Sequence, residues 1–209
     1  MISEKQKNEL NDILKITWSV SNKLFPSKPN KDGIIEYFNR RLIFLPRNVF
    51  YIIRLEIEKS FKGYSKKILY DIGFKSGMDI ASMFVKSKNL SIKEKINVVL
   101  KIGIINSLKI SKDDKYSMSY KIGGYGKHAG WLSDFEIVEE TENYVLVKIY
   151  DSFETFLVSE KQNEPICHFF RGVLAGLTAV IWGREVKECV EEKCKAKGDE
   201  YCLFRTMFY

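Results

Sequence analysis

The stretch PICHFFRGVLAGLTAVIWGREVKECVEEKCKAKGDEYCLF, residues 165–204, decides how this chain folds. After Pro165 its first half is almost wholly apolar, with Gly172 and Gly176 on one face, which predicts a helix buried on most sides. Its second half is charged and rich in cysteine. We interpret it as a polar helix over residues 185–194, a tight turn at Gly198 and a closing strand.

The cysteines of this stretch have the spacing of a metal site. Cys194 and Cys202 flank a turn in which Gly198 can adopt positive φ, and Cys167 stands at the start of the preceding helix. Three thiolates could therefore meet at one point. Zinc suits them because it accepts four ligands tetrahedrally and its binding energy stabilises a small junction. The alternative is that these are buried free cysteines, which behave as small hydrophobic residues.

The fourth ligand is open between three residues. If residues 185–194 are helical, Glu191 and Cys194 share a face, whereas Cys189 points well away from it, and this favours Glu191. His168 is the third candidate, but it would leave its helix in a different direction from its neighbour Cys167. We expect Glu191, with Cys189 as the alternative.

The rest of the 209-residue chain reads as one domain with a small appendage. Helical spacing up to residue 24 ends at a PSKP linker, which predicts an N-terminal arm over residues 1–30 and a domain over residues 31–209. Further helices are expected over residues 48–61, 66–84 and 91–108, and Gly73 and Gly77 in the second of them should permit close packing. Alternating β-branched residues predict a hairpin or meander within residues 116–158.

Charge and hydropathy narrow the class of protein. The 34 Lys and Arg exceed the 27 Asp and Glu, giving a net charge of +7, but acids are interleaved with the lysines, so direct nucleic-acid binding is not expected. No apolar run reaches the ~18 residues of a membrane span, and the N-terminus lacks the apolar core of a signal peptide. We expect a cytoplasmic protein, in which cysteines are thiols or metal ligands.

Three segments resemble one known family. DSFETFLV at 151–158, PICHFFRGVLAGLTAVIWGREV at 165–186 and VEEKCKAKGDEYCLF at 190–204 are similar to the 4-vinyl-reductase domain, a hydrocarbon-binding domain. The stretch RLIFLPRNVFYIIRLEIEKSFKGYSKKILYDIGFKSGMDIA, residues 41–81, resembles the part that precedes it in that family.

The resemblance implies an α+β fold, with helices packed on a small antiparallel sheet, as in small TRAPP tethering subunits and NO-signalling ligand-binding domains. It implies a structural zinc ion held, as in phenol sensors, by Cys167, Glu191, Cys194 and Cys202. It also implies a homodimer. Because the chain ends at Tyr209, we expect a stand-alone domain rather than a complete phenol-responsive or xylene-responsive activator.

Aromatic residues supply the candidates for a ligand pocket. A Gly-rich, aromatic stretch contains five of them: Tyr120, Tyr125, His128, Trp131 and Phe135. His128 could form a hydrogen bond to a polar group on an apolar ligand. The resemblance adds Phe153, in the DSFE motif, whose aromatic lines the pocket of the sensors. The alternative is that these aromatic residues are core and His128 lies in a surface loop.

No residue pattern predicts catalysis. The chain has 2 histidines and no discernible nucleophile–base arrangement, and a zinc ion with four protein ligands has no open position for chemistry. We therefore expect a non-enzymatic domain that binds or senses an aromatic, hydrocarbon or lipid-like molecule. The alternatives are an adaptor for protein assembly or tethering with the same fold and, third, an accessory protein of tetrapyrrole or hydrocarbon metabolism.

Overall fold

A computed structural model of the chain describes residues 31–37, 40–43, 45–87, 122–127, 129–156, 158 and 160–209. The chain forms two compact units. The first, residues 1–44 and 83–128, contains the antiparallel strands β1 (Ile35–Tyr37) and β2 (Arg40–Leu42) and a helical segment at 122–127. The second, residues 45–82 and 129–209, contains the main sheet and the cysteines. The helices predicted over 1–24 and 91–108 lie outside the described residues.

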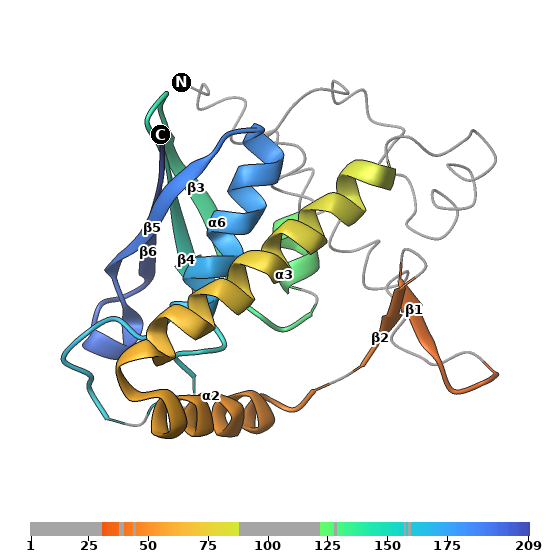
Figure 1. Cartoon of the computed structure of the whole chain (residues 1–209), viewed down its shortest axis with the longest axis horizontal. Coiled ribbons are helices and arrows are strands. Elements are labelled where there is room, and N and C mark those ends of the chain that lie inside the picture. The colour runs from red at the N-terminus through yellow and green to blue at the C-terminus, as the bar shows by residue number, and fades with distance from the viewer. Residues whose placement is uncertain are drawn as a thin grey trace. The chain divides into compact units, whose positions relative to one another are not determined.

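The main sheet of the second unit has four antiparallel strands in the order β3-β4-β6-β5 (Figure 1). They are β3 (Asp134–Glu140), β4 (Tyr144–Tyr150), β5 (Val186–Lys193) and β6 (Cys202–Phe208). Along the central strand β6, residues 202, 204, 206 and 208 are buried and the residues between them are half-buried. This period of two places one face of β6 toward the core.

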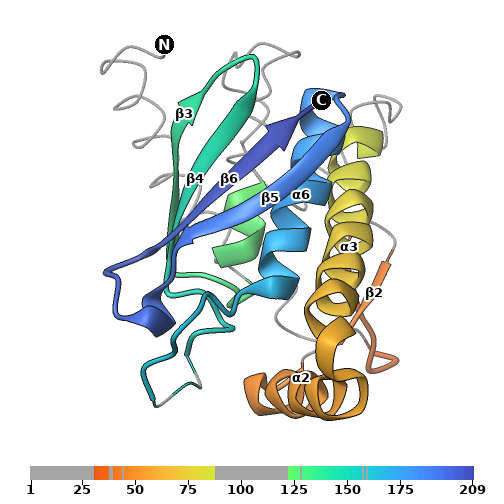
Figure 2. The same ribbon diagram turned by 60° about the vertical axis from the view of Figure 1, so that its left-hand side comes forward.

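The helices of this unit are α2 (Arg47–Phe61), the short η1 (Lys62–Tyr64), α3 (Ser65–Ser87) and α6 (His168–Trp182). They confirm the helices predicted over 48–61 and 66–84 and the apolar helix after Pro165. Figures 1 and 2 show α6 lying against one face of the sheet, with α3 beside it. The predicted hairpin is the β3–β4 pair, whereas residues 122–127 of the same segment are helical.

Glycines let α3 and α6 approach each other closely, as their spacing predicted. A Cβ atom added at Gly73 or Gly77 would overlap the carbonyl oxygens of α6, and one at Gly172 or Gly176 would overlap those of α3. No larger residue fits without moving a backbone. The two helices therefore cross in direct backbone contact and hold the N-terminal end of α6 in a defined place.

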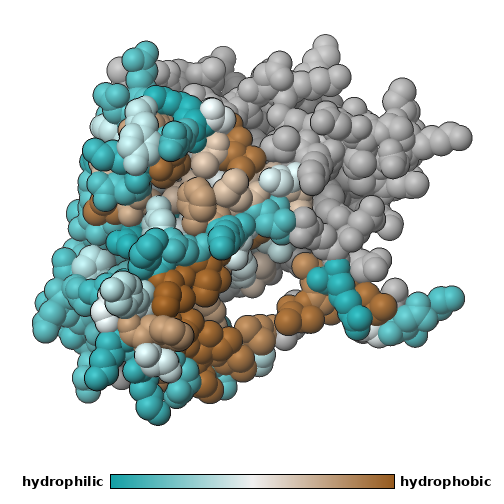
Figure 3. All heavy atoms as spheres, viewed as in Figure 1, coloured by the Kyte–Doolittle hydropathy of each residue, from teal (hydrophilic) through white to brown (hydrophobic). Residues whose placement is uncertain are grey.

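The α2 helix exposes much of its apolar surface. Ile52, Ile53, Leu55 and Phe61 are each more than two-fifths exposed, and Figure 3 shows hydrophobic residues gathered over this region. Arg54 is the buried residue of the helix. The usual arrangement of an amphipathic helix is thus partly inverted.

One predicted element is wrong. Residues 186–193, which we expected to be a polar helix, form strand β5 and pair with β6. Register shifts between Val186 and Glu188 and between Glu191 and Lys193 break the alternation of buried and exposed residues. The charged sequence therefore shows no period of two, and pairing with β6 overrides the helical preference of its Glu and Lys residues.

The fold class is confirmed as α+β, with helices packed on a small antiparallel sheet. Among the described residues, no helix combines the length and the apolar character that a membrane crossing requires.

Candidate metal centre and aromatic cluster

Four buried side chains meet where α6, β5 and β6 have their ends. Cys167 directly precedes α6, Glu191 lies near the end of β5, Cys194 follows β5, and Cys202 begins β6. Their ligand atoms all lie within 4.8 Å of one another, and the Cys167 and Cys202 sulfurs are 3.9 Å apart. The structure brings together the four residues expected to bind zinc, and this candidate metal centre could hold a metal ion.

A tight turn places two of the three thiols. The backbone N–H of Cys194 donates to the Asp199 carboxylate at 2.8 Å, and the Cys194 carbonyl accepts from Lys197 N at 2.8 Å. Gly198 closes the turn at φ 97°, a conformation that favours glycine. Lys195 N then donates to the Cys202 sulfur at 3.4 Å. The KAKGDEY segment thus folds back on itself and holds Cys194 beside Cys202.

Glu191 links the strand to the helix. Its Oε2 accepts a hydrogen bond from the Cys167 backbone N–H at 3.0 Å. Its other oxygen, Oε1, is buried and has no hydrogen-bond partner among the described residues. A buried carboxylate oxygen without a partner is costly unless something else binds it. The free oxygen and the three thiols fit the donor set that zinc prefers.

Burial makes this group of acids difficult to ionise without a cation. Burial raises the pKa of Cys167 well above its usual range, and burial with the neighbouring Cys194 raises the pKa of Glu191 to about 8. Hydrogen bonds from Cys167 and Cys202 instead lower the pKa of Cys194, so that one thiolate is favoured. A divalent cation would allow the remaining groups to ionise together.

The two rejected ligands lie apart from the group of four. Cys189 is buried on β5, where its sulfur accepts a hydrogen bond from the Thr206 hydroxyl at 3.3 Å, and burial raises its pKa to about 12. His168 is also buried, and burial together with Arg171 lowers its pKa to about 4. Because residues 186–193 are a strand, the helical argument that favoured Glu191 was wrong, although Glu191 is the residue beside the thiols.

A cluster of aromatic rings lies at the N-terminal end of α6. Phe153 contacts Phe50 at 4.7 Å between ring centroids, Phe169 and Trp131 at 6.0 Å, and Phe170 at 6.3 Å. Phe50 also packs on Phe169 at 5.1 Å. The Phe153 N–H donates to the Trp131 carbonyl at 2.8 Å, which fixes the two segments together. These five residues are called the aromatic cluster below.

The structure joins only part of the predicted pocket. Trp131 and Phe153 belong to the aromatic cluster, whereas Phe135 is a half-buried residue of β3 that pairs with Ile149. Tyr125 belongs to the helical segment of the first unit, and burial raises its pKa. The other two, Tyr120 and His128, lie outside the described residues and stay predictions.

Sequence reasoning missed two buried charged residues beside the aromatic cluster, Arg54 and Glu154. The Glu154 oxygens accept hydrogen bonds from the backbone N–H groups of Phe169 at 3.4 Å and of Phe170 at 2.6 Å, at the start of α6. Burial raises the pKa of Glu154 to about 8. An acid directly after Phe153 in the DSFE motif was the available signal, because a carboxylate suits the first turn of a helix.

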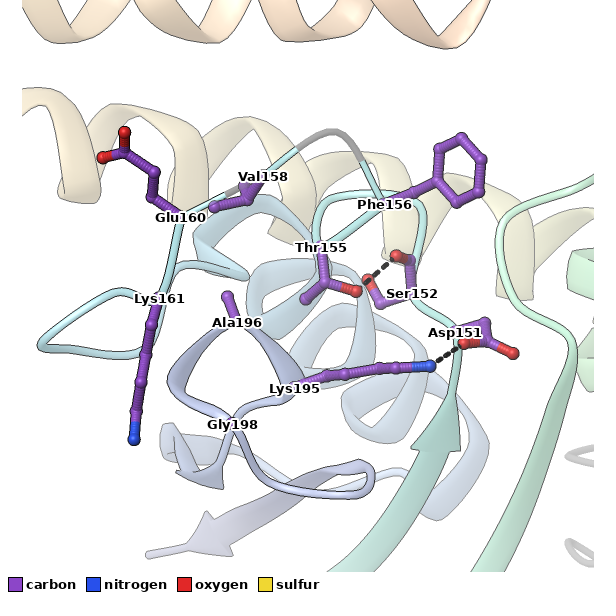
Figure 4. Close-up of a pocket in the computed structure, with 10 residues that line it drawn as sticks. All are labelled: Asp151, Ser152, Thr155, Phe156, Val158, Glu160, Lys161, Lys195, Ala196 and Gly198. Atoms are coloured by element: carbon purple, nitrogen blue, oxygen red, sulfur yellow. Dashed lines mark hydrogen bonds and ion pairs between the residues drawn. The ribbon is translucent and has the colours of Figure 1, made fainter.

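A cavity of about 370 Å³ lies beside the metal centre, between the loop at 151–161 and the turn at 195–198 (Figure 4). Asp151, at the start of the loop, forms an ion pair with Lys195, at the start of the turn. Asp151 has φ 49° and also accepts a hydrogen bond from the Ser133 hydroxyl at 3.0 Å. The cavity is lined by polar and charged groups, unlike the aromatic cluster.

The sheet, the helix and the cysteine turn together define the class of domain. Residues 146–207 match the model of the 4-vinyl-reductase domain family, so this part of the chain is a 4-vinyl-reductase domain, as the resemblance of its motifs implied. Two uncharacterized proteins of Methanocaldococcus jannaschii are similar. One is 28% identical over 160 residues, which are 77% of this chain and 74% of the relative. The other is 34% identical over 98 residues, 46% of this chain and 41% of the relative.

Two solved structures share the fold. The phenol-responsive sensory domain of the transcription activator PoxR, in complex with phenol, has a TM-score of 0.67 at 16% identity, over 93% of this chain and 90% of that one. A trafficking protein particle complex subunit 3 from Naegleria fowleri, covalently bound to palmitic acid, has a TM-score of 0.51 at 15% identity, over 78% of this chain and 92% of that one.

Proposed function

We propose that this chain is a small-molecule-binding or sensory domain whose metal centre is a structural zinc site. The match to the 4-vinyl-reductase domain family carries the proposal, and the fold that the chain shares with a phenol-responsive sensory domain supports it. The aromatic cluster supplies rings of the kind that line sites for apolar ligands. We propose that the ligand is aromatic, hydrocarbon or lipid-like and contacts Trp131 and Phe153.

The zinc would be structural rather than catalytic. Three thiolates and the Glu191 carboxylate would complete a tetrahedral shell and leave no position for substrate. The ion would tie the start of α6 to the ends of β5 and β6. Metal analysis should find about one zinc per chain, and none in a variant with both Cys194→Ser and Cys202→Ser. The matched variant Cys189→Ser should keep its zinc. A well-folded wild-type protein that binds no metal would end this part of the proposal.

Ligand binding is tested with native mass spectrometry and with tryptophan fluorescence. A co-purifying small molecule, or a fluorescence change on titration with phenol, toluene or decanoate, is the expected result. Phe153→Ala should weaken the response, whereas Phe135→Ala, outside the aromatic cluster, should not. A protein that carries no small molecule and responds to no probe would refute the proposed function.

A second function, as an adaptor for protein assembly, is favoured by the exposed apolar residues Ile52, Ile53 and Leu55 of α2. The shared fold of a trafficking complex subunit agrees with it. We also propose a cytoplasmic homodimer. Light scattering coupled to gel filtration measures the mass, and a monomer at micromolar concentration would contradict the homodimer.

A further inference from the structure

Arg54 is placed unusually for an arginine. It is 8% exposed and is the buried residue of α2, while apolar neighbours on the same helix face solvent. Arginine is almost never fully buried unless its charge is paired. The partners of its guanidinium therefore show what this position is suited to bind.

Those partners leave part of the guanidinium unused. Arg54 Nε donates to Glu58 Oε1 at 2.7 Å, and the Glu58 side chain is itself 34% exposed. Nη1 is buried and has no hydrogen-bond partner among the residues that the structure describes. A buried charged donor without an acceptor is costly, so it usually marks a bound group that completes the site.

The nearest buried acid is already satisfied. Glu154 lies close enough for the Arg54 charge to lower its pKa, against a larger rise from burial. Both of its oxygens, however, accept hydrogen bonds from the first turn of α6, and it forms no hydrogen bond with Arg54. Glu154 therefore offsets the charge of Arg54 only at a distance.

The unused donor lies beside the aromatic cluster. Phe50 is one helical turn before Arg54 on the same face of α2, and its ring packs on those of Phe153 and Phe169. Figures 1 and 2 both place α2 next to the end of α6 where these rings lie. An apolar molecule in contact with the rings would have its polar end within reach of the guanidinium.

We propose that the ligand of this domain carries a carboxylate and that Arg54 binds it, while Phe50, Phe153 and Phe169 pack on its apolar part. This inference rests on the proposed ligand-binding function and narrows it to aromatic or aliphatic carboxylic acids. The planar fork of a guanidinium matches a carboxylate with two parallel hydrogen bonds. An acid also supplies the acceptor that Nη1 lacks.

Calorimetric titration with matched probes tests the proposal at neutral pH. The pairs are 3-phenylpropanoate with 3-phenylpropan-1-ol and decanoate with decan-1-ol, which differ only in the charged end. Each acid should bind the wild type roughly 10-fold to 100-fold more tightly than its alcohol, as expected for a charge-assisted hydrogen bond. Arg54→Gln should abolish this preference and leave the alcohols unchanged. Arg184→Gln, at the opposite end of α6, is the matched control and should bind as the wild type does.

A further variant guards against misfolding of Arg54→Gln. Glu58→Gln removes the carboxylate that competes for the guanidinium, so it should tighten binding of the acids and not of the alcohols. Equal binding of acid and alcohol by the wild type would overturn the inference while the proposed function stands, and so would an acid preference that survives in Arg54→Gln. If no probe of either pair binds and no other hydrocarbon does, the proposed function falls as well.

Discussion

Replacing Glu191 by glutamine tests the metal centre most directly, because it removes one ligand charge and changes no side-chain volume. Its neighbour Glu192 is the matched control, since it lies on the same strand but pairs with Arg205 at the surface. Loss of a residue that only supports a ligand weakens metal affinity by roughly 10-fold to 100-fold, so loss of a ligand should cost at least about 100-fold. With zinc in excess of both dissociation constants, 100-fold corresponds to about 2.7 kcal/mol of folding stability.

For a chain of this length each kcal/mol shifts the melting temperature by about 2–4 °C, so Glu191→Gln should melt roughly 5–11 °C below the wild type. Thermal unfolding followed by circular dichroism, in a zinc-buffered solution and again with a chelator, measures the difference. Glu192→Gln should melt close to the wild type, and the chelator should remove most of the gap between the wild type and Glu191→Gln. Equal melting of the two variants, or a wild-type melting temperature that the chelator does not change, would refute the argument.

Two further predictions concern the core. Gly73→Ala places a Cβ atom against an α6 carbonyl and should cost about 1–3 kcal/mol in denaturant unfolding, whereas Gly63→Ala, with no atom within 4 Å, should cost far less; equal costs would contradict the close helix crossing. Burial raises the pKa of Glu154 to about 8 from 4.5, so the folded chain keeps a proton that the unfolded chain releases. Its stabilising contribution is present below about pH 4.5 and is lost as the pH rises toward about 8, so Glu154→Gln should flatten the decline in stability across that range.

The sequence predicts the elements whose signals are local. The long apolar run after Pro165 identifies α6, and Gly198 identifies the turn between the last two cysteines. Strand β5 could not be predicted, because its register shifts hide the alternation and its partner strand follows only after the turn. Glu191 was chosen with a helical argument, yet it reaches the thiols from a strand, so the chosen residue agreed with the structure although the reasoning did not.

Buried charges were the other failure, and the cause is physical. Arg54 stands among Ile, Leu and Glu residues in a helix whose apolar positions suggest an ordinary buried face. Which face is buried depends on tertiary packing, and here Phe50 contacts the aromatic cluster and carries Arg54 inward with it. A pattern of hydrophobicity identifies such a helix but not the charge that it buries.

The DSFE motif joins the two candidate sites through four consecutive residues. Asp151 pairs with Lys195, the neighbour of Cys194, and Phe153 lies at the centre of the aromatic cluster. Glu154 holds the first turn of α6, which begins directly after Cys167. A shift of Phe153 caused by a ligand would therefore act on both segments that carry cysteine ligands, because interiors are close-packed and transmit strain. In a sensory domain, this connection would let the metal centre keep the surrounding backbone rigid while the ligand acts at the rings.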